Sequence, residues 1–574
     1  MPDMKSDEQS ETVTVKLIEH IRRSVIGEGQ LFQTPFGLKP LIYSDYTASG
    51  RSLTFIEDYI TENVLPFYAN THSEASTTGR QTSAYRAQAR DLIRKSLNAC
   101  DDDAVIFCGS GASSAIQKLV DILNIRIPAN LDDAHSFSKQ IKTSERPVIF
   151  VGPYEHHSNE LAWRESIADV VCIPFDCKGA IDKDRLQAEL NKYHDRDLKI
   201  ASFSAASNVT GLLTDVKAIT RMLHQNGALA FWDYAAAGPY VSIDVTGDIS
   251  ELGNSFIDAL YISPHKFVGG PGTPGVLVIK RKHMKNRVPS LPGGGTVSYV
   301  SPHSHTYLSD AESREEGGTP AIVESIRAGM VFQLKDAVGA HTIESLEHAL
   351  VTRAIKRWSQ HPAIHILGNL EAARLSIVSF QILWQGKPLH FGFVDAVMND
   401  LFGIQVRGGC SCAGPYGHDL LAIDITHSQA IADAVDAGHA ILKPGWVRLN
   451  LNYFIGEETF EYLLRAVELM AEHAWKLLSK YEYDPEHALW KCEEGTALCL
   501  CDLGDISYAQ GNFKALLNNT HGHRRALSCY LDEAEQLMTN PDLVTPDFEQ
   551  LQPAPTLPER YEKLRWFSLP CDIA

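Results

Sequence analysis

Short apolar runs separated by polar stretches occur throughout the first half of the chain. Continuous runs of Val, Ile, Leu, Phe and Ala are typical of strands buried on both faces of a sheet. Such runs lie at residues 104–108, 147–151, 227–232, 259–262 and 275–279. The segment 200–211 contains a further strand followed by a turn at Asn208.

Apolar positions with helical spacing occur before, between and after these runs. Residues 1–30 predict one amphipathic helix. Its apolar positions recur at spacings of three and four: Val13, Leu17, Ile18, Ile21 and Val25. Residues 80–99 predict another helix, and 321–360 predict a long helix leading to a smaller domain. That domain should contain a strand at 375–383 and a helix at 391–401.

Residues 258–281 place a lysine just beyond the end of a predicted strand. The apolar run stops at Ser-Pro-His-Lys, residues 263–266, and a glycine-rich turn leads into the next run. Lys266 can be a solvated loop lysine. It can also form a Schiff base with a carbonyl cofactor, which requires a neutral amine kept from full solvation. Upstream, the strand at 227–232 ends in Asp233, which would place a carboxylate near the lysine.

Composition and charge narrow the possible classes of protein. The chain has 574 residues, enough for two or three domains, and 44% are hydrophobic. Its 52 Lys and Arg against 71 Asp and Glu give a net charge of −19, which disfavours nucleic acid and anionic membranes as partners. No apolar run reaches the ~18 residues of a membrane span.

The N-terminal sequence and the cysteine content both bear on the compartment in which the protein is found. Residues 1–15 are polar and acidic and resemble neither a signal nor a transit peptide. The 11 cysteines are sparse and odd in number, which predicts reduced thiols in the cytoplasm instead of a disulfide framework.

Several motifs, taken in order, resemble the class V aminotransferase family, and within it the cysteine desulfurase and selenocysteine lyase branch. The resemblance covers roughly residues 40–475. It implies an α/β fold of the pyridoxal phosphate fold type I, with a mixed, mainly parallel sheet in a large domain and a smaller α+β domain. The expected divisions are an N-terminal helical segment at 1–40, a large cofactor-binding domain at 41–330, a small domain at 331–480 and an extension at 481–574.

The resemblance implies how pyridoxal phosphate would be bound. Lys266 would form the Schiff base, and Asp233 would pair with the pyridine nitrogen, which keeps the ring an electron sink. The glycine-rich turn at 109–116 opens a helix, where backbone N–H groups attract phosphate. The implied cofactor contacts are Lys266, Asp233, His156, Asn208, Ser110, Gly111, Ser113, Ser263, His265 and Thr319.

Four of these positions carry further expectations. His156 would stack on the ring and take part in catalysis, although a helix cap is an alternative use. Asn208 would reach the phenolic oxygen and the substrate carboxylate. Thr319, in a Gly-Gly-Thr-Pro loop, would reach the phosphate of a second subunit, which implies a homodimer. Ala236 stands where the family usually has Gln or His, so the phenolic oxygen lacks one usual partner.

Residues 407–414, Arg-Gly-Gly-Cys-Ser-Cys-Ala-Gly, resemble the family loop whose cysteine accepts sulfur from the substrate. Counting from Arg407 places that cysteine at Cys412, two residues after Cys410. The pair could instead bind metal, but no second Cys or His pair lies nearby in the sequence, and we expect no metal. Arg448 matches the arginine that binds the substrate carboxylate, a task suited to a planar guanidinium.

These features predict a pyridoxal phosphate enzyme acting on a small L-amino acid. The first hypothesis is a cysteine desulfurase that converts L-cysteine to L-alanine and leaves a persulfide on Cys412, from which a sulfur-acceptor protein could take sulfur. The alternatives are a selenocysteine lyase, or a C–S lyase, epimerase or transaminase in which Cys412 is not catalytic. A pseudoenzyme or scaffold is the non-enzymatic alternative.

Two regions are left without a firm assignment. Residues 43–50 and 70–72 occupy places of substrate-side loops in the family, and His72 is a weak candidate for substrate contact. Residues 481–574 carry 7 Lys and Arg against 16 Asp and Glu. Helical stretches at 527–538 and 558–567 predict that this extension is folded, with Cys499 and Cys501 as core thiols.

Overall fold

The computed structural model shows two compact units. It describes residues 3–71, 75–250, 253–492, 495, 502–508, 523–540 and 557–572. The first unit comprises Met1–Ile26, Tyr46–Ala349 and Glu371–Ser376, and the second comprises Gly27–Asp45, Leu350–Leu370 and Ile377–Ala574. His72, Cys499 and Cys501 lie outside the described residues.

A seven-stranded sheet forms the centre of the first unit. Its strands, in spatial order, are β4 (Asp103–Cys108), β12 (Gly275–Lys280), β11 (Ala259–Ile262), β8 (Leu229–Asp233), β7 (Lys199–Ser204), β5 (Val148–Val151) and β6 (Asp169–Cys172). Strand β12 is antiparallel to both of its neighbours, whereas the other adjacent pairs are parallel. Most of these strands are buried along their whole length, as their continuous apolar sequences predict.

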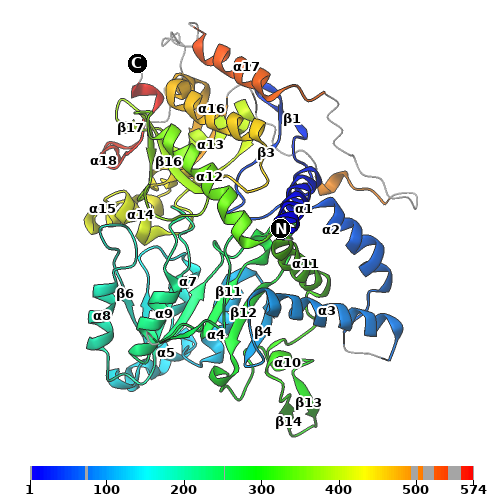
Figure 1. The fold of residues 1–574 in the computed structure, drawn as a ribbon. Coiled ribbons are helices and arrows are strands. Elements are labelled where there is room, and N and C mark those ends of the chain that lie inside the picture. Colours follow the sequence, from blue (N-terminus) through cyan, green and yellow to red (C-terminus); the bar gives the residue numbers. More distant parts are fainter. Residues whose placement is uncertain are drawn as a thin grey trace. The chain divides into compact units, whose positions relative to one another are not determined.

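Helices α4, α7 and α9 of the first unit pack against the strands of this sheet (Figure 1). The helices are α1 (Asp3–Ser24), α2 (Thr54–Tyr59), α3 (Thr77–Ser96), α4 (Gly111–Ile122), α5 (Ala129–His135), α6 (Phe137–Gln140), α7 (Ser158–Arg164), α8 (Lys183–Lys192), α9 (Val216–Gln225), α10 (Ala311–Glu315) and α11 (Ile322–Val338). Helices α8 and α9 begin at Asp182 and Asp215, whose side chains accept backbone N–H groups of the first turn. Two hairpins complete the unit: β9 (Ile249–Ser250) with β10 (Gly253–Asn254), and β13 (Val297–Val300) with β14 (His305–Tyr307).

The prediction of one long helix at 321–360 is wrong. Helix α11 ends at Val338, and a second helix, α12 (Ala340–Trp358), begins two residues later. Gly339 separates them with a φ of +88°, a left-handed value that glycine adopts without steric cost. Hydrophobic periodicity continues across this glycine, which explains why the pattern alone predicted a single element.

The second unit contains a smaller antiparallel sheet. Its strands are β15 (Ile364–Ile366), β16 (Ile377–Trp384), β20 (Trp446–Asn450) and β19 (Arg407–Gly409) in spatial order, with β17 (Lys387–Pro388) paired to β16. The other strands are β1 (Leu31–Thr34), β2 (Gly37–Pro40), β3 (Ile42–Tyr43), β18 (Ile404–Gln405), β21 (Tyr481–Asp484) and β22 (Leu489–Cys492). The helices are α13 (Phe391–Phe402), α14 (Gly414–Leu420), α15 (Ile425–Asp436), α16 (Glu457–His473), α17 (Leu527–Thr539) and α18 (Glu559–Glu562).

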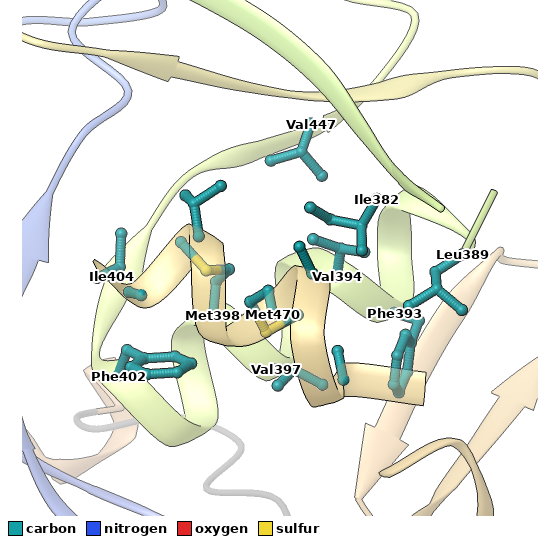
Figure 2. Packing of buried hydrophobic residues seen from close by; sticks show 14 of the residues in the cluster. Ile382, Leu389, Phe393, Val394, Val397, Met398, Phe402, Ile404, Val447 and Met470 are labelled. Carbon is teal, nitrogen blue, oxygen red and sulfur yellow. The ribbon is translucent and has the colours of Figure 1, made fainter. Parts of the chain in front are cut away.

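One hydrophobic core joins the sheet and helices of the second unit. Figure 2 shows side chains of α13, α16, β16 and β20 gathered in it, including Val397, Met470, Ile382 and Val447. The core also contains residues from the predicted extension: Tyr481, Tyr483, Trp490, Cys492, Leu527, Tyr530, Ala534, Met538, Leu557, Phe567 and Leu569. The described parts of the extension are therefore integral to this unit. Across the described residues, no helix is both long and apolar enough to cross a bilayer.

Candidate functional site

Lys266 lies at the end of a short 3-10 helix, Pro264–Lys266, which follows β11. Its backbone N–H donates to the carbonyl of Ser263 (3.0 Å), and its side chain is half-buried. The backbone around it is tightly packed, because a β-carbon on Gly270 would lie 2.1 Å from the Pro264 carbonyl oxygen. The lysine is thus fixed at the carboxyl end of a parallel strand, where α/β sheets bind their ligands.

Asp233 lies at the same end of the neighbouring strand, β8, in register with Tyr261 of β11. Its side chain is buried, and its carboxylate accepts the N–H of Ala235 at 2.7 Å. Burial raises the pKa of Asp233, and the positive charge of Lys266 opposes this rise. A protonated pyridine nitrogen would stabilise the charged form of such a carboxylate. These residues therefore fit the pairing that pyridoxal phosphate requires.

The N-terminus of α4 lies against the turn that carries the lysine. A β-carbon on Gly111, which has a φ of +59°, would lie 2.8 Å from His265 Cε1 and 3.0 Å from Ser263 Oγ. The N–H of Ala112 donates to Ser263 Oγ at 2.9 Å. Ser110 precedes the helix and is exposed. Because the first backbone N–H groups of a helix lack intrahelical acceptors, this turn can bind a phosphate.

Hydrogen bonds link two of the predicted cofactor residues through Ser158, a residue that the sequence did not single out. The hydroxyls of Ser113 and Ser158 lie 2.6 Å apart, and Ser158 Oγ lies 3.1 Å from His156 Nδ1. The backbone N–H of Ser158 also donates to Nδ1 at 3.1 Å. Since Nδ1 accepts this bond, the neutral imidazole of His156 carries its hydrogen on Nε2.

A second buried carboxyl group, Glu155, lies close enough to Asp233 for the two charges to interact. It accepts hydrogen bonds from Ser204 Oγ (2.6 Å), from Ser204 N–H (2.9 Å) and from Asn159 Nδ2 (2.6 Å). Burial raises the pKa of Glu155 to about 7, and the charge of Asp233 adds to the effect. Ser204 pairs with Asp233 across β7 and β8, so Glu155 stabilises the strand end next to the aspartate.

Asn208 and Thr319 lie in loops of the same unit. Asn208 is buried in the turn after β7, where Ser207 Oγ accepts the N–H groups of Val209 and Thr210, each at 3.2 Å. Thr319 is exposed, and its hydroxyl accepts a hydrogen bond from Asn70 Nδ2 at 3.5 Å. Ala236 is buried at the position where the family usually has a polar side chain.

Arg448 belongs to the second unit, where it lies on β20 opposite Arg407 of β19. Its guanidinium is buried and donates to Asp45 Oδ1 at 2.8 Å. Arg407 Nη1 lies 3.8 Å from the other oxygen of Asp45. Burial lowers the pKa of Arg448, and Asp45 partly offsets this. The sequence named the segment containing Asp45 as substrate-side but did not predict that its carboxylate pairs with the arginine.

The two candidate cysteines lie in a tight turn that follows β19. The N–H of Ala413 donates to the carbonyl of Cys410 at 3.1 Å, which closes the turn. Ser411 and Cys412 at its centre have φ values of +53° and +56°, a left-handed conformation that costs a non-glycine residue ~1 kcal/mol or more. Both cysteines are free and half-buried. Among the described residues, no group of three His, Cys, Asp or Glu side chains could bind a metal ion.

Asp395 of α13 lies beneath the strand that leads into this turn. Its Oδ2 accepts the N–H of Gly408 at 3.2 Å. Burial raises the pKa of Asp395 to about 7; the hydrogen bond from Gly408 and the charge of Arg407 oppose the rise, and the charge of Asp45 adds to it. The helical pattern of α13 gave no sign of a half-buried acid with a raised pKa at this position.

The fold and this arrangement of lysine, aspartate and helix N-terminus define a pyridoxal phosphate enzyme of fold type I. The model of one family, Aminotransferase class-V, matches residues 42–428. The chain therefore belongs to the class V aminotransferase family, whose members are pyridoxal phosphate-dependent.

Similar proteins of known name agree with this assignment. A probable cysteine desulfurase of Halalkalibacterium halodurans is 28% identical over 380 residues, which cover 66% of this chain and 85% of that protein. One of Streptomyces coelicolor is 28% identical over 377 residues, with coverages of 65% and 84%.

Solved structures show the same fold. A cysteine desulfurase from Thermococcus onnurineus aligns with a TM-score of 0.59 at 22% identity, and it covers 75% of this chain and 95% of its own. The cysteine desulfurase CsdA of Escherichia coli gives 0.58 at 20% identity, with coverages of 75% and 94%.

We predict that Asp395→Asn changes how stability depends on pH. An unfolded aspartic acid titrates near pH 3.9, whereas Asp395 in the folded protein titrates at about 7. Between these values the folded state binds the extra proton, so this residue makes the free energy of unfolding fall as pH rises from about 4 to 7. Asparagine can still accept the Gly408 N–H. The advantage of the variant should therefore grow by about 2–3 kcal/mol between pH 5 and pH 8.

Urea denaturation of the two proteins at pH 5 and pH 8 measures this difference. Asp436→Asn, an exposed substitution on α15, is the matched control. An Asp395→Asn advantage that is the same at both pH values would contradict the prediction.

Proposed function

We propose that the protein is a cysteine desulfurase, which converts L-cysteine to L-alanine and leaves the substrate sulfur on Cys412. The observation that supports this most is the turn at Cys412, because its backbone is held in a strained conformation directly after a strand paired with that of Arg448. Strain of this kind collects at functional sites, where surrounding structure maintains it. The names of the similar proteins favour the same activity.

The first unit would bind and orient the cofactor. Lys266, Asp233, His156, Asn208 and the turn before α4 would hold pyridoxal phosphate, which when bound withdraws electrons from the substrate α-carbon. Lys266 Nζ then takes the α-proton and returns a proton to the substrate as general base and acid. Asp233 keeps the ring nitrogen protonated, and buried Glu155 and Ser204 keep that aspartate in place.

The second unit would supply the sulfur acceptor. The Cys412 thiolate attacks the sulfur of the substrate, and the carbon–sulfur bond breaks with its electron pair remaining on the carbon. That carbon then takes a proton, which gives alanine, and the sulfur stays on Cys412 as a persulfide. Arg448 would bind the substrate carboxylate as a bidentate donor.

The persulfide needs an acceptor, and we propose a small thiol or a sulfur-acceptor protein in the cytoplasm. The cytoplasm is part of this proposal, and none of the described cysteines forms a disulfide.

Cys412→Ser should reduce cysteine turnover at least about a hundredfold, because transfer of sulfur needs a nucleophile aimed at it. The cofactor absorption and substrate binding should remain nearly unchanged. Cys410→Ser, at the first position of the same turn, should have a much smaller effect and is the matched control. The measurement is sulfide and alanine release from a panel of amino acids that includes cysteine and selenocysteine.

The outcome of this panel separates the candidate activities. Full cysteine desulfuration by Cys412→Ser would exclude the persulfide mechanism. Activity with selenocysteine alone would identify a selenocysteine lyase, and racemisation or amino transfer without sulfide would identify another class V activity. Equal losses in the two cysteine variants would indicate a shared structural contribution.

Lys266→Ala should remove the visible absorption of the bound cofactor while the protein remains folded. Borohydride reduction of the wild-type holoenzyme, followed by peptide mapping, should find the cofactor attached to Lys266. Lys335 is the internal comparison, since burial lowers the pKa of Lys335 to about 8 and its amine donates to the Gly238 carbonyl at 2.7 Å. Attachment at Lys335 would show that the assignment of Lys266 is wrong.

We further propose that two copies of the chain form a homodimer in which Thr319 contacts the cofactor phosphate of the other copy. Thr319 is exposed on its own chain. The β13–β14 hairpin of the same unit (Figure 1) carries Tyr299 and Val300. These two side chains are 67% and 61% exposed. Exposed apolar side chains of this kind favour a protein interface.

Thr319→Ala should weaken retention of pyridoxal phosphate severalfold, since it removes one hydroxyl donor to the phosphate. Equilibrium dialysis measures the retention, and analytical ultracentrifugation measures the assembly state. Thr426→Ala, an exposed substitution on α15 of the second unit, is the control. An active, cofactor-loaded monomer would contradict both the dimer and the shared site.

A further inference from the structure

Aromatic side chains of the C-terminal extension pack against His390, the N-cap residue of α13. His390 is completely buried, and its Nδ1 accepts the N–H of Gly392 and the indole N–H of Trp490, each at 3.0 Å. Its Nε2 lies 3.2 Å from the carbonyl of Ile441, so Nε2 carries the hydrogen. Burial lowers the pKa of His390 to about 3, so the ring is neutral at physiological pH. The extension therefore supplies one of the partners of this helix cap.

Phe391, the next residue, packs closely on two glycines, Gly408 of β19 and Gly445 just before β20. A β-carbon on Gly408 of β19 would lie 2.9 Å from Phe391 Cδ2. A β-carbon on Gly445, just before β20, would lie 2.6 Å from Phe391 Cδ1 and 2.9 Å from the carbonyl carbon of Gly409. Real β-carbons do not approach other atoms this closely, so the ring and the two backbones fit only because these positions lack side chains. Phe391 thus supports the backbone that leads directly into the turn of Cys410 and Cys412.

Trp566 of the extension stacks against Phe391. The two rings are nearly parallel, at 15°, with centroids 6.1 Å apart. The indole N–H of Trp566 donates to the carbonyl of Leu442 at 3.2 Å, which fixes the ring close to the segment that enters β20. Next along the chain, the N–H of Ser568 donates to the carbonyl of Pro388 at 2.9 Å. The extension therefore packs on both segments that position Phe391.

We propose that Trp566 is a positioning residue for the cysteine turn. Its ring holds Phe391 between β19 and β20, and Phe391 in turn fixes the backbone of Gly408 and Gly409, from which the turn emerges. The strained conformation of Ser411 and Cys412 persists only if the adjoining backbone cannot relax. This inference rests on the proposed function for its catalytic consequence, but the geometry of the turn can be tested without any substrate. The residue lies beyond position 428, where the match to the class V family model ends.

In the Trp566→Ala variant loaded with pyridoxal phosphate, iodoacetamide should alkylate Cys412 several times faster than it does in the wild-type holoenzyme. The reason is that loss of the indole frees Phe391 and allows the turn to open. Peptide mass spectrometry reads the rate at Cys412 separately from that at Cys410. In the same variant kcat for cysteine desulfuration should fall about tenfold, with KM and cofactor absorption nearly unchanged. Trp566→Phe keeps an aromatic ring against Phe391 and should restore both values.

Two further variants separate positioning from a general loss of stability. Trp475→Ala removes another stacked tryptophan of the second unit. Its ring centroid lies 5.4 Å from that of Trp384, which is on β16 beyond the residues that pair with β20. It should leave the alkylation rate of Cys412 unchanged. Gly445→Ala introduces a β-carbon that Phe391 must move away from. It should reproduce the effect of Trp566→Ala, which keeps the test valid if the latter does not fold.

The proposal would be overturned if Cys412 in folded Trp566→Ala were alkylated at the wild-type rate. It would also be overturned if Trp475→Ala raised that rate as much as Trp566→Ala does. A wild-type enzyme that releases no sulfide from any amino acid would instead refute the proposed function. In that case the alkylation comparison would still decide whether Trp566 positions the turn.

Discussion

The buried carboxylate of Asp233 is the constraint on which the first unit depends. An ionised carboxylate removed from water is strongly disfavoured unless it has a charged or hydrogen-bonding partner. In this structure the partners are the backbone N–H of Ala235 and the positive charge of Lys266, which lies after the neighbouring strand. The parallel order of β8 and β11 places both groups at one end of the sheet. A cofactor with a basic ring nitrogen and a carbonyl group can satisfy both residues at once.

Backbone strain is the corresponding constraint in the second unit. Two successive non-glycine residues in the left-handed region, Ser411 and Cys412, cost the fold ~2 kcal/mol or more. Such a cost is tolerated where neighbouring backbone is fixed on both sides. Before the turn, β19 is paired with β20, and after it, Gly417 of α14 packs closely on Trp446. The thiol is thereby presented at a fixed place while remaining partly accessible.

The sequence predicted the local elements and the motifs well, because both are encoded in consecutive residues. The strands around Asp233 and Lys266 and the glycine-rich start of α4 lie where their apolar patterns placed them. The partners of the site residues could not be predicted in the same way. Asp45 and Arg448 are 403 residues apart, and nothing in either segment specifies the other. Ser158 and Asp395 were missed for the same reason, since each becomes notable only through a tertiary contact or through burial.

The two units would carry different parts of the proposed reaction, and this difference accounts for the glycines around the cysteine turn. Cofactor chemistry needs buried charges that do not move, and the first unit provides them with a rigid sheet. In the proposed reaction the Cys412 thiol would receive sulfur and pass it on, so it could not be enclosed in the same manner. Glycines 408 and 445 let an aromatic ring approach the backbone closely, so the turn is supported from the core while both cysteines are only half-buried. The extension adds the ring of Trp566, which stacks against Phe391.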